Sequence, residues 1–130
     1  MENAIQEWIK ASEYDLETAQ VMADTGRYLY VTFMCQQAIE KTLKAIYCLK
    51  KNELPPRTHN LLYLVDILEL SLTEPDKALL SVLNQFYLES RYPLERSKLA
   101  KEVDAAKSRE YLDKTKGVWR CLKQALTQSK

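Results

Sequence analysis

The sequence predicts a single all-α domain over residues 1–130, an up-and-down antiparallel helical bundle of four long helices plus a shorter or bent terminal element. Three observations support this fold class. Only two glycines and four prolines occur, which leaves little material for β-hairpin turns. The chain is rich in Leu, Ala, Lys, Glu and Gln, which favour helices. Apolar residues recur at helical spacing in segments with short connections, as in antiparallel bundles.

Two long helices are expected in the first half of the chain. Apolar residues at positions 5, 8, 9, 16, 19 and 23 recur near helical spacing and predict a helix over residues 3–25. Gly26 supplies a stop signal for this helix. A second helix is expected over residues 28–51, and it ends at Asn52 and the Pro55–Pro56 pair.

The second half of the chain carries two clear cap signals. Thr58 is expected to cap a third helix that runs through residue 70. Thr73 is expected to cap a fourth helix that begins with Pro75 in its first turn and reaches about residue 90. Residues 91–103 are expected to form a loop broken at Pro93, followed by a last helix to about residue 126.

The formal net charge is only +1, but its sign alternates along the chain. The charge is −5 over residues 1–26, +4 over 27–57, −4 over 58–90 and +6 over 91–130. One interpretation is complementary packing of neighbouring helices. The other is that the two basic segments line an anion-binding surface.

Cysteine and histidine usage indicates no metal site and no cofactor. The three cysteines have no Cys-x-x-Cys spacing, and the chain has a single histidine. An odd number of scattered thiols favours a reducing compartment over a disulfide framework. The first residues lack the basic stretch of a signal peptide, and no apolar run approaches membrane-spanning length. We therefore expect a cytoplasmic protein without membrane association.

Residues 33–45 form the most informative segment, because one predicted helix face mixes polar and apolar side chains. At 3.6 residues per turn, Gln37, Glu40, Lys41 and Lys44 lie on neighbouring rows. Polar groups beside a packing stripe need partners. Two interpretations stay open: a polar network inside the bundle or across a dimer, or phosphate contacts made by the two lysines.

Two later positions carry further candidate site residues. His59 follows the predicted Thr58 cap, so it is expected in the first turn of the third helix, where it can hydrogen-bond Glu40 or act as a general base. Arg91 ends the fourth helix beside Tyr92. Its guanidinium is expected either to reach back to Glu40 or Glu89 or to bind an anion.

Three of these segments resemble the HEPN domain family, the higher eukaryote and prokaryote nucleotide-binding domains. Residues 36–45 resemble the family's Gln-Gln-Ala-x-Glu-Lys-x-Leu-Lys-Ala signature. Residues 58–61 resemble its Thr-His-(Asp/Asn)-Leu step, and residues 90–93 resemble its Arg-Tyr-Pro corner. Residues 8–16 resemble its first helix, so the resemblance covers about residues 5–125.

The resemblance implies a function as well as a fold. Ribonucleolytic members of the family carry an Arg-x(4–6)-His motif near the last helix, whereas the single histidine here is His59. The resemblance therefore implies a non-catalytic protein that binds a nucleotide and pairs with a minimal nucleotidyltransferase in a toxin–antitoxin-like module. Its implied ligand site would include Gln37, Glu40, Lys41, Lys44, His59, Arg91 and Tyr92.

Two alternatives of other classes stay open. One is a metal-independent ribonuclease that uses His59 and Arg91 on RNA. The other is a structural or adaptor dimer without a ligand.

A homodimer is expected in each case because the second and fourth helices carry surplus apolar residues. A helix that is apolar all round is either central or covered by a second subunit, and a bundle of five helices is expected to have no fully central helix. A two-fold interface would bring the Arg91–Pro93 corner near its symmetry mate and form a shared basic cleft, as HEPN dimers typically have. The surplus residues are Tyr28, Leu29, Tyr30, Val31 and Phe33, and Leu79, Leu80, Val82, Leu83, Phe86, Tyr87 and Leu88.

Overall fold

Six helices make up the fold over residues 1–128, and the predicted all-α class is confirmed. The computed structural model of the chain describes residues 1–128 and has no strand in that range. In chain order, the helices are α1 (Glu2–Asp24), α2 (Tyr28–Lys51), α3 (Leu61–Ile67), α4 (Glu74–Glu89), α5 (Pro93–Glu102) and α6 (Ala105–Gln128).

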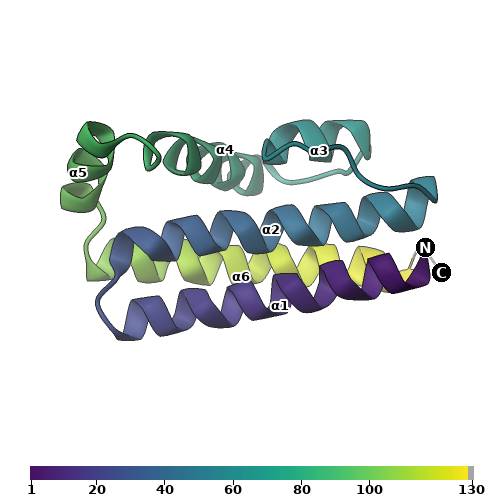
Figure 1. Cartoon of the computed structure of the whole chain (residues 1–130), viewed down its shortest axis with the longest axis horizontal. Coiled ribbons are helices and arrows are strands. Elements are labelled where there is room, and N and C mark those ends of the chain that lie inside the picture. Colours follow the sequence, from purple (N-terminus) through teal and green to yellow (C-terminus); the bar gives the residue numbers. More distant parts are fainter. Residues whose placement is uncertain (129–130) are drawn as a thin grey trace.

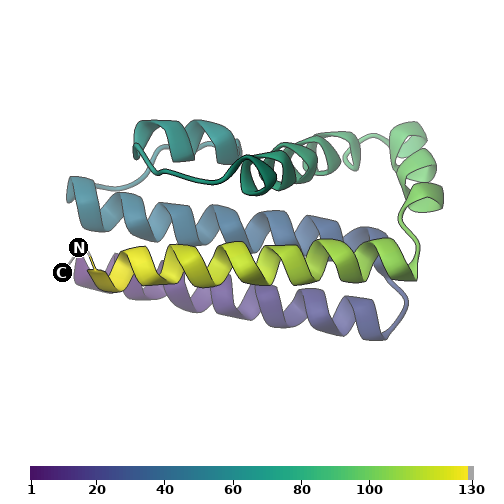
Figure 2. The same ribbon diagram turned by 180° about the vertical axis from the view of Figure 1, so that it is seen from behind.

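The helices α1, α2, α4 and α6 run in alternating directions along the bundle, as in an up-and-down topology (Figure 1). The three longest helices, α1, α2 and α6, lie side by side, and α3 and α4 follow one another along the far side of α2. The view from behind shows the same layers, with α5 turned across one end of the bundle (Figure 2). The two ends of the described chain therefore lie at the opposite end of the bundle from α5.

Helix α2 is the centre of the bundle, contrary to the expectation that no helix would be central. It contacts all five other helices. Its residues Val31, Cys35, Ile39, Leu43 and Ile46 are fully buried in the main core. Of the surplus apolar residues of α2, Val31 is buried within one chain, whereas Tyr28, Leu29, Tyr30 and Phe33 are half-buried.

The expected loop over residues 91–103 is wrong, because most of this segment is helix α5. Pro93 lies in the first turn of α5, where its fixed φ suits a helix and its missing N–H costs no hydrogen bond. Leu99 and Val103 are buried against Phe86 of α4. Pro93 therefore begins a helix, and residues 90–92 separate it from the end of α4 at Glu89.

The third helix is shorter than expected and begins later. The cap is Asn60, whose Oδ1 accepts a hydrogen bond from the Tyr63 N–H at 3.2 Å, and the helix ends before Glu69, which has φ +54°. His59 consequently lies in the loop before α3 and not in its first turn. The predicted Thr73 cap of α4 is confirmed by a 3.3 Å hydrogen bond from the Asp76 N–H.

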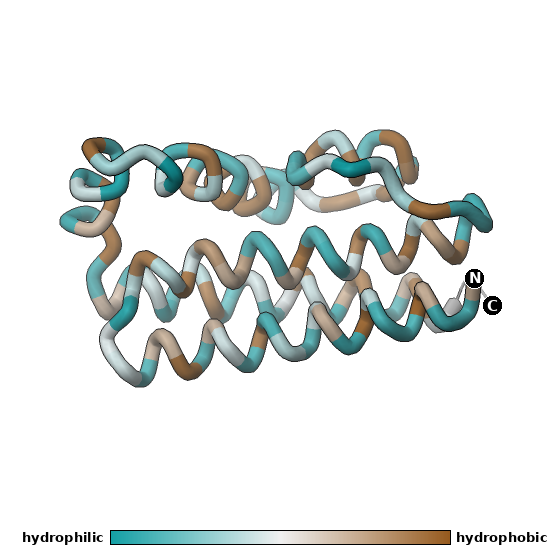
Figure 3. The backbone as a smooth tube through the Cα atoms, viewed as in Figure 1, coloured by the Kyte–Doolittle hydropathy of each residue, from teal (hydrophilic) through white to brown (hydrophobic). Residues whose placement is uncertain are grey.

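Hydrophobic and hydrophilic residues are interleaved along the long helices (Figure 3). None of the described helices combines the length and the apolar character needed to cross a bilayer.

Candidate functional site

A carboxylate buried on α2 holds the single histidine of the chain. The Nδ1 atom of His59 lies 2.9 Å from Oε1 of Glu40, whose side chain is only 4% exposed. An ionised carboxylate accepts hydrogen bonds and donates none, so Nδ1 carries the proton in this contact. The His59 side chain is 53% exposed, and its second ring nitrogen, Nε2, does not contact Glu40.

Gln36 and Gln37 complete the attachment of the His59 loop to α2. The Gln36 amide donates to the backbone carbonyl of His59 at 2.7 Å and to Oε1 of Glu40 at 3.2 Å. The Gln37 amide donates to Oε1 of Gln36 at 2.7 Å. Gln36 is completely buried, so this network fixes both the loop and the carboxylate.

The two lysines of the sequence signature point toward α1 and do not line the histidine pocket. The Nζ atom of Lys44 lies 3.0 Å from Oε2 of Glu40, and its side chain is 7% exposed. The same ammonium lies 5.5 Å from the centre of the Trp8 ring. Lys41 forms an ion pair with Asp15 of α1. The structure thus places both ammonium groups in interhelical contacts, as the polar-network interpretation expects.

A pocket of about 340 Å³ lies between the loop before α3 and the last turns of α4. Tyr87 forms one wall, and its ring stacks on Phe33 with the centroids 5.3 Å apart. The His59 ring lies 5.1 Å from the Tyr87 ring, and the Arg91 guanidinium lies 5.9 Å from it. The pocket is lined by Arg57, Thr58, His59, Asn60, Asn84, Tyr87, Leu88 and Arg91.

Burial is the largest cause that raises the pKa of Tyr87 above its usual value, and the charge of Glu40 adds to it. Arg91 acts in the opposite direction and lowers this pKa. The balance keeps the phenol neutral at physiological pH. A neutral phenol can donate a hydrogen bond to an anion in the pocket.

Two asparagines hold the pocket together across its two sides. Oδ1 of Asn84 accepts a 3.0 Å hydrogen bond from the Leu61 N–H, and its amide donates to Oδ1 of Asn60 at 2.9 Å. This contact attaches the start of α3 to α4. It also fixes the distance between the loop with Arg57 and the helix that carries Tyr87.

The sequence-predicted site residues thus separate into groups. His59 and Arg91 meet in the pocket, and Glu40 and Gln37 belong to the network beneath His59. Tyr92 is exposed and is the cap residue of α5, outside the residues that line the pocket. Arg91 lies over the Tyr87 ring, in place of the expected contact with Glu40 or Glu89.

Six of the eight lining residues were not among the predicted site residues, including three that shape the chemistry of the pocket: Arg57, Asn84 and Tyr87. A signal for two of them exists in the sequence, because Asn84 and Tyr87 of α4 are spaced by three and four residues from each other and from Arg91, in the turn just after α4, and so all three lie on one side. Arg57 carries no such signal, since the loop that brings it to α4 has no helical spacing.

The chemistry of the pocket suits an anion. Arg57 and Arg91 contribute two guanidinium groups, which bind phosphate or carboxylate through paired hydrogen bonds. His59 and Tyr87 add a protonatable nitrogen and a neutral hydroxyl.

Comparisons with known proteins point to one family. The family described as HEPN domain matches residues 5–125 of the chain. A search of proteins with curated descriptions finds no match. The fold is similar to the crystal structure of TT1696 from Thermus thermophilus, with 23% identity and a TM-score of 0.80, covering 95% of this chain and 98% of that one. It is also similar to ST0689, an archaeal HEPN homologue, with 25% identity and a TM-score of 0.70, covering 97% and 98% of the two chains.

Proposed function

Because this chain belongs to the HEPN domain family, we propose that it is a non-catalytic subunit that binds a nucleotide in the pocket between α3 and α4. The observation that carries the proposal is the meeting of Arg57, His59 and Arg91 around one pocket with a neutral tyrosine wall. A nucleotide offers phosphate oxygens to the two guanidinium groups and the phenol, and His59 donates to phosphate from Nε2 when its ring carries both protons. The family, whose members bind nucleotides or cleave RNA, makes this ligand class the first to test.

The proposed roles follow from the contacts of each side chain. Arg57 and Arg91 contact the phosphate directly, and His59 adds a contact oriented by Glu40. Gln37 and Lys44 act as positioning residues, through Gln36 and Glu40 respectively. Lys41 and Tyr92 lie outside the pocket, so we assign them no direct contact with the ligand.

Isothermal titration with ATP and with AMP tests the proposal. We expect binding by the intact chain and at least a tenfold loss of affinity in Arg91→Ala. Arg120→Ala, an exposed arginine on α6 away from the pocket, serves as the charge-matched control. No binding heat with either nucleotide, or an equal loss of affinity in both variants, would contradict the proposal. The alternative of a structural or adaptor protein without a ligand would then remain.

The proposed partner is a minimal nucleotidyltransferase, in a toxin–antitoxin-like module. This part of the proposal depends on the family resemblance, because no contact in the chain identifies a partner. Affinity purification of the tagged chain from its native cells should recover a nucleotidyltransferase in stoichiometric amount. A preparation that contains the chain alone would contradict the pairing and leave the nucleotide site standing.

One observation favours a second function, a metal-independent ribonuclease. Since Nδ1 of His59 donates to Glu40, its Nε2 is free to accept a proton from a ribose hydroxyl, and Arg91 lines the same pocket. RNA cleavage by the purified chain that is lost in His59→Ala would favour this function. Absence of cleavage across several RNA substrates would favour the non-catalytic one.

A further inference from the structure

The imidazole of His59 is held at one nitrogen, so a second proton on the ring goes to the other. Nδ1 lies 2.9 Å from Oε1 of Glu40, and the backbone carbonyl of His59 accepts from the Gln36 amide at 2.7 Å. Because an ionised carboxylate only accepts hydrogen bonds, Nδ1 keeps its proton in this contact. Nε2 is therefore the atom at which the 53% exposed ring gains or loses a proton.

Charged and polar groups face this ring from three elements. On α2, Glu40 contacts the ring, and Lys44 binds the other oxygen of the same carboxylate at 3.0 Å. On α4, the Tyr87 ring lies 5.1 Å from the imidazole, and Arg91, in the turn just after α4, lies over the Tyr87 ring. In the loop before α3, Arg57 lines the same pocket. The carboxylate beneath the ring attracts a positive imidazole, whereas the two guanidinium groups repel one.

An anion bound by the two guanidinium groups changes this balance. It offsets the charges that repel a positive ring, and its oxygens accept hydrogen bonds. A neutral ring has an acceptor at Nε2, which gains nothing from phosphate oxygens. A ring with both protons has a donor there, and a hydrogen bond between two charged groups is among the stronger ones.

We propose that binding of a nucleotide phosphate in the pocket is coupled to the uptake of one proton by His59, so that the pocket binds more tightly as the pH falls. The proton comes from the solvent and forms the N–H bond at Nε2, and the nucleotide itself is unchanged. Histidine side chains titrate between about pH 5 and 8, so the coupling acts in a physiological range. It rests on the proposed nucleotide site and adds control of that site by pH.

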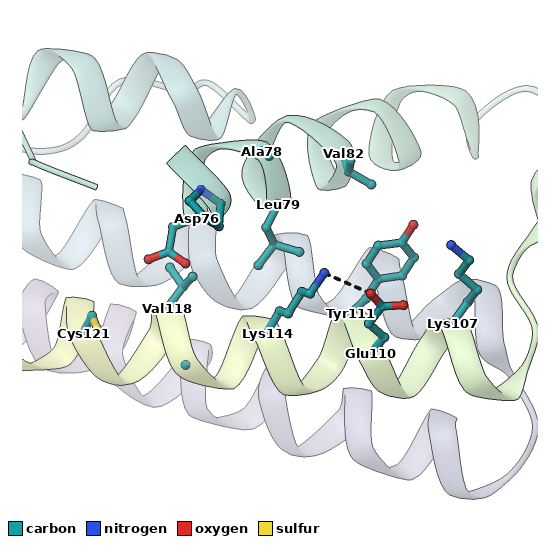
Figure 4. Close-up of a pocket in the computed structure, with 12 residues that line it drawn as sticks. Asp76, Ala78, Leu79, Val82, Lys107, Glu110, Tyr111, Lys114, Val118 and Cys121 are labelled. Carbon is teal, nitrogen blue, oxygen red and sulfur yellow. Dashed lines mark hydrogen bonds and ion pairs between the residues drawn. The ribbon is translucent and has the colours of Figure 1, made fainter. Parts of the chain in front are cut away.

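A larger hollow between α4 and α6 contains cations but lacks this combination (Figure 4). Its volume is about 690 Å³, and its lining includes Lys107, Glu110 and Lys114 but no histidine. The Nζ atom of Lys114 lies 3.0 Å from Oε1 of Glu110, which compensates its charge. Carboxylates and lysines change charge outside the range of histidine. Lys107→Ala therefore removes an exposed cation away from the pocket and serves as a control.

The coupling separates the two functions considered for the pocket. A general base takes a proton from a ribose hydroxyl, so a ribonuclease needs Nε2 without a proton. Nucleotide binding as proposed needs Nε2 with one. RNA cleavage would thus increase as the pH rises through the titration of His59, over the same range in which nucleotide affinity decreases.

Because His59 is the single histidine of the chain, NMR reads its ring without any substitution. The carbon-bound protons of the imidazole are followed from about pH 5 to about pH 9, with and without saturating AMP. We expect AMP to move the midpoint of the ring titration upward by about one pH unit, which corresponds to about tenfold tighter binding to the protonated ring. An unmoved midpoint in a chain that binds AMP would overturn the coupling and leave the proposed nucleotide site standing.

Isothermal titration with AMP measures the same coupling through the ligand. A phosphate monoester itself titrates near about pH 6, so the intact chain is compared with His59→Asn, in which no imidazole titrates. The asparagine amide can still donate to Glu40 from the place of Nδ1. Between about pH 5.5 and about pH 8, the affinity of the intact chain should fall about tenfold relative to that of the variant. Lys107→Ala should behave as the intact chain does.

His59→Gln gives a second variant if circular dichroism melting shows that His59→Asn has lost its fold. Its amide nitrogen takes the place of Nε2 and donates at every pH, so its affinity should also lack the pH dependence of the intact chain. The same pH dependence in the intact chain and in either folded variant would overturn the coupling. If AMP binds at no pH, the proposed function fails and the coupling fails with it.

Discussion

His59 and Glu40 lie nineteen residues apart in sequence, yet Nδ1 of the histidine is 2.9 Å from Oε1 of the carboxylate. The other carboxylate oxygen of Glu40 accepts from Lys44 at 3.0 Å, and Lys44 lies over Trp8 of α1. A continuous series of contacts thus connects the exposed imidazole in the pocket with the α1–α2 interface. Glu40 and Lys44 of α2 therefore orient His59 in the pocket without lining the pocket themselves.

We expect Glu40→Gln to destabilise the fold strongly. The substitution keeps the shape of the side chain but leaves the buried Lys44 ammonium without its carboxylate. Removing one partner of a buried ion pair lowers the free energy of unfolding by about 3 kcal/mol or more. Urea denaturation followed by circular dichroism measures this change.

The chain offers a matched control for this substitution. Glu110 and Lys114 have the same spacing and the same 3.0 Å separation, but both side chains are at least half exposed. Glu110→Gln should change the unfolding midpoint little, because exposed pairs contribute little. Equal destabilisation by the two substitutions would show that burial of Lys44 does not determine the cost.

Asn60→Ala is expected to lower stability and to loosen the pocket. The Oδ1 atom of Asn60 caps α3 and also accepts from the Asn84 amide, so two contacts are lost. Loss of a helix cap costs about 1 kcal/mol. Thr58→Ala, at the position predicted as the cap, should cost less, because the Thr58 hydroxyl accepts from the Asn60 N–H at 3.2 Å and caps no helix in the described part of the chain. Thermal denaturation of both variants compares them, and a larger loss in Thr58→Ala would contradict the assignment of the cap.

Sequence analysis placed the ends of α1, α2 and α4 within one or two residues, because these ends are set by local signals. Gly26, Asn52 and Thr73 act on the turns next to them, whatever the rest of the fold does. Helix α5 was missed because Pro93 both interrupts one helix and suits the first turn of the next. Propensity alone does not separate the two effects.

Part of the candidate pocket could be predicted from the sequence, and the rest depends on how the helices pack. His59, Arg91 and Glu40 were singled out, and the structure brings all three to the pocket or directly beneath it. Helical spacing put Lys41 and Lys44 on neighbouring rows with Glu40, but it does not reveal that α1 covers those rows. Arg57 joins the site only through the path of the loop, which depends on how α3 packs.

The buried thiol of Cys35 should make stability fall with pH in alkaline solution. Burial raises the pKa of Cys35 from 9.0 to about 12, against smaller opposing effects of Thr115 and Lys116. Between these values the unfolded chain releases the proton and the folded chain keeps it. Stability is therefore fully present below pH 9 and falls, by up to about 1.4 kcal/mol per pH unit, toward pH 12.

Urea denaturation between about pH 8.5 and 11 measures this dependence. Cys35→Ala should make the free energy of unfolding fall less steeply with pH, by nearly the slope that one proton contributes. Cys121→Ala, at an exposed thiol, should leave the slope unchanged. Cys48 and Tyr87, whose pKa values are also raised, contribute to the slope of all three proteins alike. An unchanged slope in Cys35→Ala would show that the thiol ionises in the folded state.

Arg57 provides the sharpest test of the proposed nucleotide pocket, because neither helical spacing nor the family signature selects it. It lines the pocket on the side opposite the last turns of α4, so Arg57→Ala should lose one of two guanidinium contacts with the phosphate. We expect at least a tenfold weaker affinity for ATP by isothermal titration, similar to the loss in Arg91→Ala. Arg57→Lys should recover only part of it, since lysine keeps the charge but lacks the planar fork that binds two oxygens at once. Full affinity in Arg57→Ala would restrict the ligand to the α4 side of the pocket, and full recovery in Arg57→Lys would reduce the role of Arg57 to its charge.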